Sequence, residues 1–335
     1  MKRFALLTLV FGLVLTTACS EDEGSSSKQG ASQKMLPTSN GSHHELLIFC
    51  DQDPWSRGAG LAVAEGLAAP ISSLLQKEPR FHISQLPHAS ANRLVKRGKS
   101  ILVLKIIPDS TRIYAVKNVW ADPQMVVEVI APDLATMQNM LRNGAEDIAR
   151  RYENHNLEVL RPRMRRSAKK NLPPSFKDLG IERMLLPLYA KTTLVKDQMT
   201  IMRYDTKNSL QYYVFTRRPA TDLDLSPTRM TAERNKILAQ YFEGQQDGSH
   251  LATESRIAPT FESVTLGRDD GMLVQGMFRT EGGFGGGPYM SVAVLDEAQG
   301  EMVTVDCILF APGADKRKLL MEFEVMLRSL RLAQP

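Results

Sequence analysis

Short apolar runs separated by polar turns recur along most of this chain, and this pattern predicts many strands. The runs are too short for helices and are bounded by Gly, Pro, Asn, Asp or Ser, as strands in globular proteins are. In the first half, strands are predicted at residues 46–50, 81–86, 100–106, 112–117 and 125–130. In the second half, they are predicted at residues 199–204, 210–218, 263–266, 272–279, 289–295 and 302–310.

Helical spacing of apolar residues appears between and after these runs. One helix is predicted from about residue 58 to a break or kink at Pro70, and a longer one follows Asp133, which is a suitable N-cap. Ser226 and Pro227 predict the start of a third helix, and a last helix is predicted at residues 315–330. These elements predict an α+β fold, with two α/β-sandwich-like halves of mostly antiparallel sheets covered by helices.

The amino-terminal residues have the pattern of an export signal. Lys2 and Arg3 precede an apolar run at residues 4–15, which is too short to span a bilayer, and small residues lead to Cys19. This order predicts a lipoprotein signal peptide at residues 1–18, with Cys19 carrying fatty acyl chains such as palmitate. Thr16 departs from the usual box, which has an aliphatic residue three places before the Cys. An ordinary signal peptide with an incidental Cys is the alternative.

An acidic cluster follows the predicted lipid site. Ser20, Glu21, Asp22 and Glu23 are similar to the tag that some Gram-negative bacteria use to send lipoproteins to the outer face of the outer membrane. The alternatives are a plain solvated tether and an anchor that faces the periplasm. Residues 19–44 have few large apolar side chains, so we expect a disordered tether there, ending in a solvated His43–His44 pair.

Two ordinary domains fit the remaining length. Pro173 and Pro174 end a basic stretch, so we place an N-terminal α+β domain at residues 45–172 and a C-terminal α+β domain at residues 173–335. The basic stretch itself, Arg161 to Lys170, is consistent with binding of an acidic polysaccharide or a lipid headgroup, although a solvated helix face is the simpler interpretation.

Composition changes this picture little. The chain is 43% hydrophobic and 24% charged, which is ordinary for a globular protein, and its net charge of +5 becomes +3 without Lys2 and Arg3. That charge balance gives no reason to expect a nucleic-acid partner. Cys50 and Cys307 both lie in apolar runs, so we expect two buried thiols; a disulfide between them is allowed but not favoured.

No catalytic signature stands out. The chain has no nucleophile elbow, phosphate-binding loop or zinc spacing, so no cofactor, metal or catalytic residue is predicted. Trp55 and Trp120 each lie in a turn with acidic residues, among them Asp51 and Asp122, an arrangement found in sugar-binding sites as well as in turns that simply fold on themselves. Phe284 and Gly286 lie in a glycine-rich link between two strands, which is either a ligand contact or a wide hairpin tip.

Several segments together resemble a known family. The chain is similar, over roughly residues 46–330, to the lipoproteins grouped as domain of unknown function 4837, and the segments that carry the resemblance are residues 51–55, 119–124, 256–261, 285–289 and 311–317. The resemblance implies an exported, membrane-anchored protein of a Gram-negative lineage that uses acidic surface-export tags. It implies no reaction.

From the sequence we therefore expect a surface-exposed outer-membrane lipoprotein of unknown activity. A non-enzymatic binding or scaffold module is favoured, attached to the membrane through Cys19 and contacting an envelope protein or glycan. The alternative is a glycan-binding protein or hydrolase with a site near Asp51, Trp55, Trp120 and Asp122. The sequence names no ligand, biological process or oligomeric state.

Overall fold

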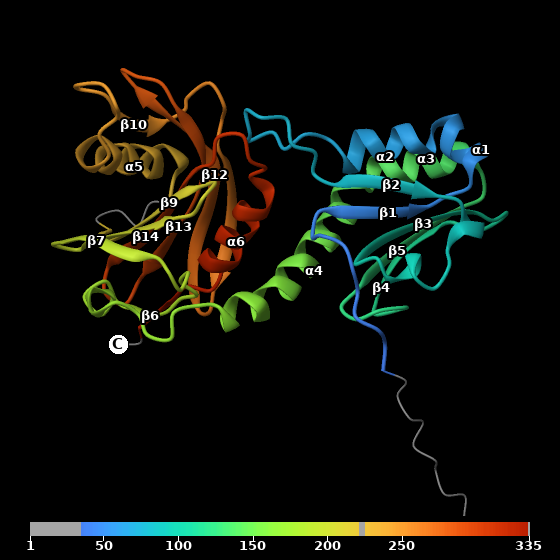
Figure 1. Cartoon of the computed structure of the whole chain (residues 1–335), viewed down its shortest axis with the longest axis horizontal. Helices are drawn as coiled ribbons and strands as arrows, with labels where there is room; N and C mark the ends of the chain where they lie inside the picture. The colour runs from blue at the N-terminus through green and yellow to red at the C-terminus, as the bar shows by residue number, and fades with distance from the viewer. Residues whose placement is uncertain (1–34, 221–224, 334–335) are drawn as a thin grey trace, which may run out of the picture. The chain divides into compact units, whose positions relative to one another are not determined.

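The computed structural model describes residues 35–220 and 225–333 (Figure 1). Its first strands are β1 (Glu45–Phe49), β2 (His82–Leu86), β3 (Ser100–Ile106), β4 (Arg112–Lys117) and β5 (Met125–Ala131). The helices beside them are α1 (Gln52–Pro54), α2 (Gly60–Leu67), α3 (Leu134–Asn143) and α4 (Ala145–Arg166). Short helical turns are η1 (Trp55–Ala59), η2 (His88–Ser90), η3 (Val95–Arg97) and η4 (Pro174–Phe176).

The first five strands form one mixed sheet in the order β2-β1-β3-β5-β4. β1 pairs in parallel with β2 and β3, β3 pairs in parallel with β5, and only β4 is antiparallel. The parallel pairing follows from the connections, because residues between β1 and β2 form α2 and cross the sheet. α2, α3 and α4 cover one face of the sheet (Figure 1), where Ile48, Leu102 and Val127 are fully buried.

The remaining strands are β6 (Ile181–Arg183), β7 (Lys191–Lys196), β8 (Met199–Asp205), β9 (Leu210–Pro219), β10 (His250–Thr253), β11 (Thr260–Leu266), β12 (Asp269–Glu281), β13 (Gly286–Asp296), β14 (Glu301–Phe310) and β15 (Arg331–Leu332). Two helices accompany them, α5 (Pro227–Tyr241) and α6 (Arg317–Leu327).

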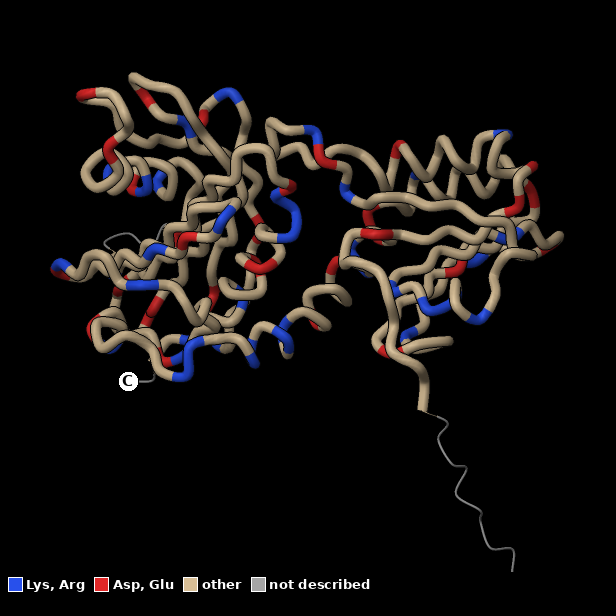
Figure 2. The backbone as a smooth tube through the Cα atoms, in the orientation of Figure 1, with Lys and Arg blue, Asp and Glu red and all other residues tan. Residues whose placement is uncertain are grey.

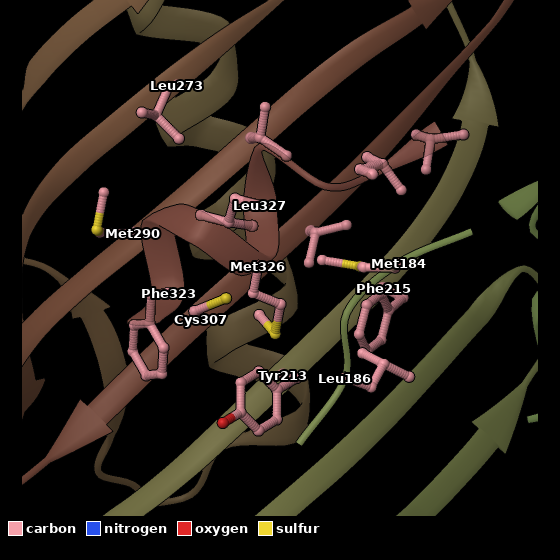
Figure 3. Packing of buried hydrophobic residues seen from close by; sticks show 14 of the residues in the cluster. Met184, Leu186, Tyr213, Phe215, Leu273, Met290, Cys307, Phe323, Met326 and Leu327 are labelled. Atoms are coloured by element: carbon pink, nitrogen blue, oxygen red, sulfur yellow. The ribbon is translucent and has the colours of Figure 1, made fainter. Parts of the chain in front are cut away.

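An eight-stranded antiparallel sheet organises this second half. Its order is β10-β12-β13-β14-β9-β8-β7, with β11 paired to β12, while β6 and β15 pair separately. Alternate residues of its strands face opposite sides: Val305 and Cys307 pack with Phe323 of α6, and Ile308 packs with Leu238 of α5. Figure 3 shows the α6 side, where Tyr213, Phe215 and Met290 surround the helix.

The α+β fold class is confirmed. Within it, the antiparallel arrangement expected for both halves is found in the second sheet, whereas the first is mostly parallel. Asp133 caps α3 as predicted, its carboxylate accepting a hydrogen bond from the Thr136 N–H. The helix predicted to run on from it breaks at Gly144, where α4 begins.

Part of the predicted tether contacts the first sheet. Thr38 forms a parallel bridge with Asp122, and Asn40 forms one with Gly98. His43 and His44 are half-buried rather than solvated, since His44 meets the ring of His82 edge-on at 5.2 Å. The predicted signal peptide, the lipid site Cys19 and the acidic cluster at residues 20–23 lie outside the described residues. Over the described ranges, no helix has the length and apolar character needed to cross a bilayer.

Candidate functional site

Asp51 and Trp55 lie at the carboxyl end of β1. The Asp51 carboxylate accepts a hydrogen bond of 3.1 Å from the backbone N–H of His88, and the Trp55 indole lies directly over Gly60, where any Cβ would come within 2.7 Å of the ring. An open crevice of about 620 Å³ is lined by Asp51, Cys50 and Lys105, but not by Trp55. Burial raises the pKa of the Cys50 thiol to about 11, so this thiol is protonated at neutral pH and is a poor nucleophile.

Trp120 and Asp122 lie in the turn between β4 and β5. The backbone N–H of Trp120 donates to the side-chain oxygen of Gln124 at 2.9 Å, and the ammonium of Lys96 lies 5.3 Å from the indole ring centre. Trp120 packs against the buried residues on the sheet face opposite α2. The backbone carbonyl of Asp122 accepts a hydrogen bond of 3.2 Å from the Ser39 N–H, and Asp122 is exposed.

These two turns lie at opposite edges of the first sheet. Asp51 follows the carboxyl end of β1, whereas Trp120 precedes the amino end of β5, and β1, β3 and β5 run in parallel. β3 between them has 7 residues, so the edges are separated by about 20 Å. The structure therefore does not bring Asp51 and Trp55 together with Trp120 and Asp122.

The glycine-rich link is the tip of the β12–β13 hairpin. β12 ends at Glu281 and β13 begins at Gly286, so the tip comprises residues 282–285. Gly282 and Gly285 have φ angles of 72° and 115°, which explains the choice of glycine at these two positions. Phe284 at the tip is 90% exposed, and its hairpin belongs to the second sheet, whereas both tryptophan turns adjoin the first.

A buried ion pair lies between α5 and the second sheet. Arg234 of α5 and Asp306 of β14 approach to 3.0 Å, both side chains are less than one-tenth exposed, and the guanidinium carbon lies 3.6 Å from the Tyr289 ring centre. Burial raises the pKa of Asp306 and Arg234 opposes that rise. The cavity beside the pair is only about 40 Å³, room for roughly three water molecules, so it is too small for a substrate.

The most distinctive charged surface is an open groove of about 1110 Å³ at the end of α4. We call it the basic groove and define it by its cationic side chains, Arg161, Arg165, Arg166, Lys169, Lys170, Lys177, Arg183 and Arg331. Glu182 is the only acidic residue among those that line it. In Figure 2, blue segments follow one another along the end of α4 and the chain leading to β6.

In the described structure these eight cations have no acidic partner at ion-pair distance, unlike the arginines that form the protein's ion pairs. Among the described residues, no carboxylate lies within ion-pair distance of any of the eight, whereas Arg80 contacts Glu146 and Glu153 at 2.6 Å. Burial, together with the positive charges of Arg183 and Arg161, lowers the pKa of Arg331. The groove therefore carries a large excess of positive charge.

Sequence reasoning found only part of this groove. The stretch from Arg161 to Lys170 supplies five of its cations, and Arg163, which that stretch also contains, does not line the groove. Lys177, Arg183 and Arg331 are separate in sequence, and the antiparallel pairing of β15 with β6 brings Arg331 beside Arg183. No local sequence pattern indicates this pairing.

Metal and thiol chemistry have no candidate centre in the described part of the chain. It contains no group of three or more His, Cys, Asp or Glu side chains placed to hold a metal ion. Cys50 and Cys307 are both free and buried, one beside the first sheet and one within the second.

Comparison with known proteins gives two family matches. Residues 181–329 match the family described as Domain of unknown function (DUF4837), and residues 39–165 match a second family, Domain of unknown function (DUF8532). No curated protein matches the chain. The crystal structure of PA94, a protein of unknown function from Pseudomonas aeruginosa, has 10% sequence identity and a TM-score of 0.27, covering 44% of this chain and 99% of its own.

The two matches divide the segments that carry the resemblance seen in the sequence. The segments at residues 256–261, 285–289 and 311–317 fall within the first match, and those at residues 51–55 and 119–124 fall within the second. The predicted domain boundary at residues 172–173 lies between the two matched spans. Over residues 181–329, this chain resembles the family described as domain of unknown function 4837.

Proposed function

We propose that this protein is a lipid-anchored binding module of the bacterial outer membrane, held there through Cys19 and exposed at the cell surface. The order of basic, apolar and small residues before Cys19 supports the anchor, and the acidic residues after it support surface export. The expected partner is an envelope glycan or protein, and no nucleic acid is involved.

The basic groove is the observation that carries the binding role. Neighbouring cations without acidic partners repel one another, which destabilises the folded protein. An anionic ligand that binds them removes this repulsion. The negative end of the helix dipole stabilises two of these cations, Arg165 and Arg166, which lie in the last turn of α4. It does not account for Lys177, Arg183 or Arg331, which lie outside that helix.

The separation of the acidic turns favours binding over hydrolysis. Glycoside hydrolases place their two catalytic carboxylates about 5–10 Å apart. Asp51 and Asp122 lie at opposite sheet edges, about 20 Å apart by strand length. These carboxylates cannot act on one bond.

The intact mass of the mature protein tests the anchor. We expect cleavage before Cys19 and the added mass of acyl chains on that residue. A mature terminus elsewhere, or an unmodified thiol at Cys19, contradicts the proposal.

Cross-linking in intact cells tests the binding role. Partners recovered with the wild-type protein should be lost with Cys19→Ala, because the variant is no longer held where those partners lie. Recovery of the same partners from both proteins contradicts an anchor-dependent role.

A further inference from the structure

We infer that the basic groove binds a linear acidic polysaccharide, a chain that carries a carboxylate or sulfate on successive sugar units. This inference rests on the proposed function, since it names the ligand of the binding module. It is argued from the number and kind of the cations, from the concave form of the site, and from the lack of exposed aromatic rings among the described residues that line it.

The kind of cation favours planar acidic groups. Five of the eight cationic side chains are arginines and three are lysines. The guanidinium group presents its donors as a rigid fork that matches a carboxylate or sulfate with two parallel hydrogen bonds, and it keeps its charge in a partly buried site. Several such groups along one groove fit a ligand with repeated charges better than a single small anion.

The form of the site argues against a flat membrane surface as the ligand. The cations come from α4, from the chain that follows it and from the β6–β15 pair, so they surround a hollow of about 1110 Å³. The anionic surface of a bilayer attracts polybasic segments that lie directly against it. A single flexible chain can enter a groove and contact both walls.

The remaining lining fits sugar rings better than nucleotide bases. Leu172 and Pro173, which are half-buried, supply apolar surface beside the cations, against which the C–H faces of pyranose rings can pack. Proteins that bind single-stranded nucleic acid stack bases on exposed aromatic rings. Phe176 is the only aromatic residue that lines the groove in the described structure, and it is 1% exposed.

Calorimetric titration of the full-length protein in neutral detergent micelles tests the inference. The probes are alginate oligomers of defined length, which carry one carboxylate per sugar, and uncharged dextran oligomers of the same length. We expect saturable binding of alginate that strengthens with oligomer length, weakens steeply with added salt and is absent for dextran.

Two double variants of α4 locate the site. Arg161→Gln with Arg165→Gln removes two groove charges and should weaken alginate binding about tenfold or more, because each guanidinium supplies charge-assisted hydrogen bonds. Arg151→Gln with Arg163→Gln removes the same charge from exposed positions of the same helix that do not line the groove. This matched control should change affinity by less than about twofold.

Several outcomes overturn the inference. They are an equal loss in both double variants, no binding of alginate at low salt, or tighter binding to micelles doped with phosphatidylglycerol than to alginate. The last result assigns the groove to lipid headgroups instead. A negative result in the alginate titration does not affect the mass measurement that tests acylation of Cys19. The two experiments therefore test the ligand class and the anchor independently.

Discussion

At the scale of single residues, His43 shows what contact with the folded domain does to a side chain expected to be solvated. Burial, and next the positive charge of Lys99, lower the pKa of His43 from 6.5 to about 4. The amide of Asn156 donates to the His43 carbonyl at 2.5 Å. Asn156 is more than a hundred residues away in sequence, so no local pattern reveals this environment.

The shifted pKa predicts a pH-dependent stability. The folded state binds the His43 proton less tightly than the unfolded chain, so this contribution to stability is complete above pH 6.5 and is lost as the pH falls toward 4. His43→Leu should therefore lose less stability than the wild type between pH 7 and pH 4.5. Urea denaturation at both pH values measures the free energy of unfolding of each protein. The prediction is contradicted if wild type and His43→Leu lose the same amount of stability between the two pH values.

At the scale of elements, the apolar runs predicted most of the strands, and three of the four described strands that they missed, β6, β7 and β15 but not β10, have identifiable causes. β7 is exposed along nearly its whole length, so its sequence lacks the alternation that marks a half-buried strand. β6 and β15 have 3 and 2 residues and exist because they pair with each other. The same pairing completes the basic groove, so the sequence indicated one wall of that site and not the other.

The link between α5 and the second sheet offers a test at this scale. Asp306→Ala leaves the guanidinium of Arg234 buried without its charge partner, which should lower the free energy of unfolding by about 3–5 kcal/mol. Chemical denaturation measures the loss. Arg234→Met combined with Asp306→Leu should recover much of it, because an apolar pair does not bury an isolated charge.

A surface pair provides the control for that experiment. Arg203 and Asp205 lie 2.9 Å apart on β8 but are both about half exposed, so Asp205→Ala should cost at most about 1 kcal/mol. Equal losses for Asp205→Ala and Asp306→Ala would mean that burial does not govern the cost.

At the scale of the whole molecule, charge is nearly balanced in total but uneven in position. The net charge is only +5 over 335 residues, whereas eight cations and one acid line the basic groove. Composition therefore indicates no anionic partner, and only the fold shows where positive charge collects. The predicted anchor and export signal precede residue 24, and the first described strand, β1, begins at Glu45.

This separation predicts that the surface signal can be removed without loss of folding. Replacing Glu21, Asp22 and Glu23 with alanine should retain the acylated protein in the outer membrane but turn it to the periplasmic side. Protease added to intact cells should then digest the wild type and spare the variant, while both are digested after lysis. Equal digestion of the two proteins in intact cells contradicts the prediction, and equal melting temperatures confirm that folding is unaffected.

The bridges at Thr38 and Asn40 have a mechanical consequence for an anchored protein. Tension on the chain from its membrane end reaches these two isolated bridges before it reaches β1, which is held between two parallel neighbours. Residues 38–40 are held by a few backbone hydrogen bonds and by the Arg97 guanidinium, which donates to the Thr38 carbonyl. They should therefore detach first and lengthen the tether while the sheet stays intact. In the proposed lipid-anchored protein, this segment would therefore give way under shear before the folded domain does.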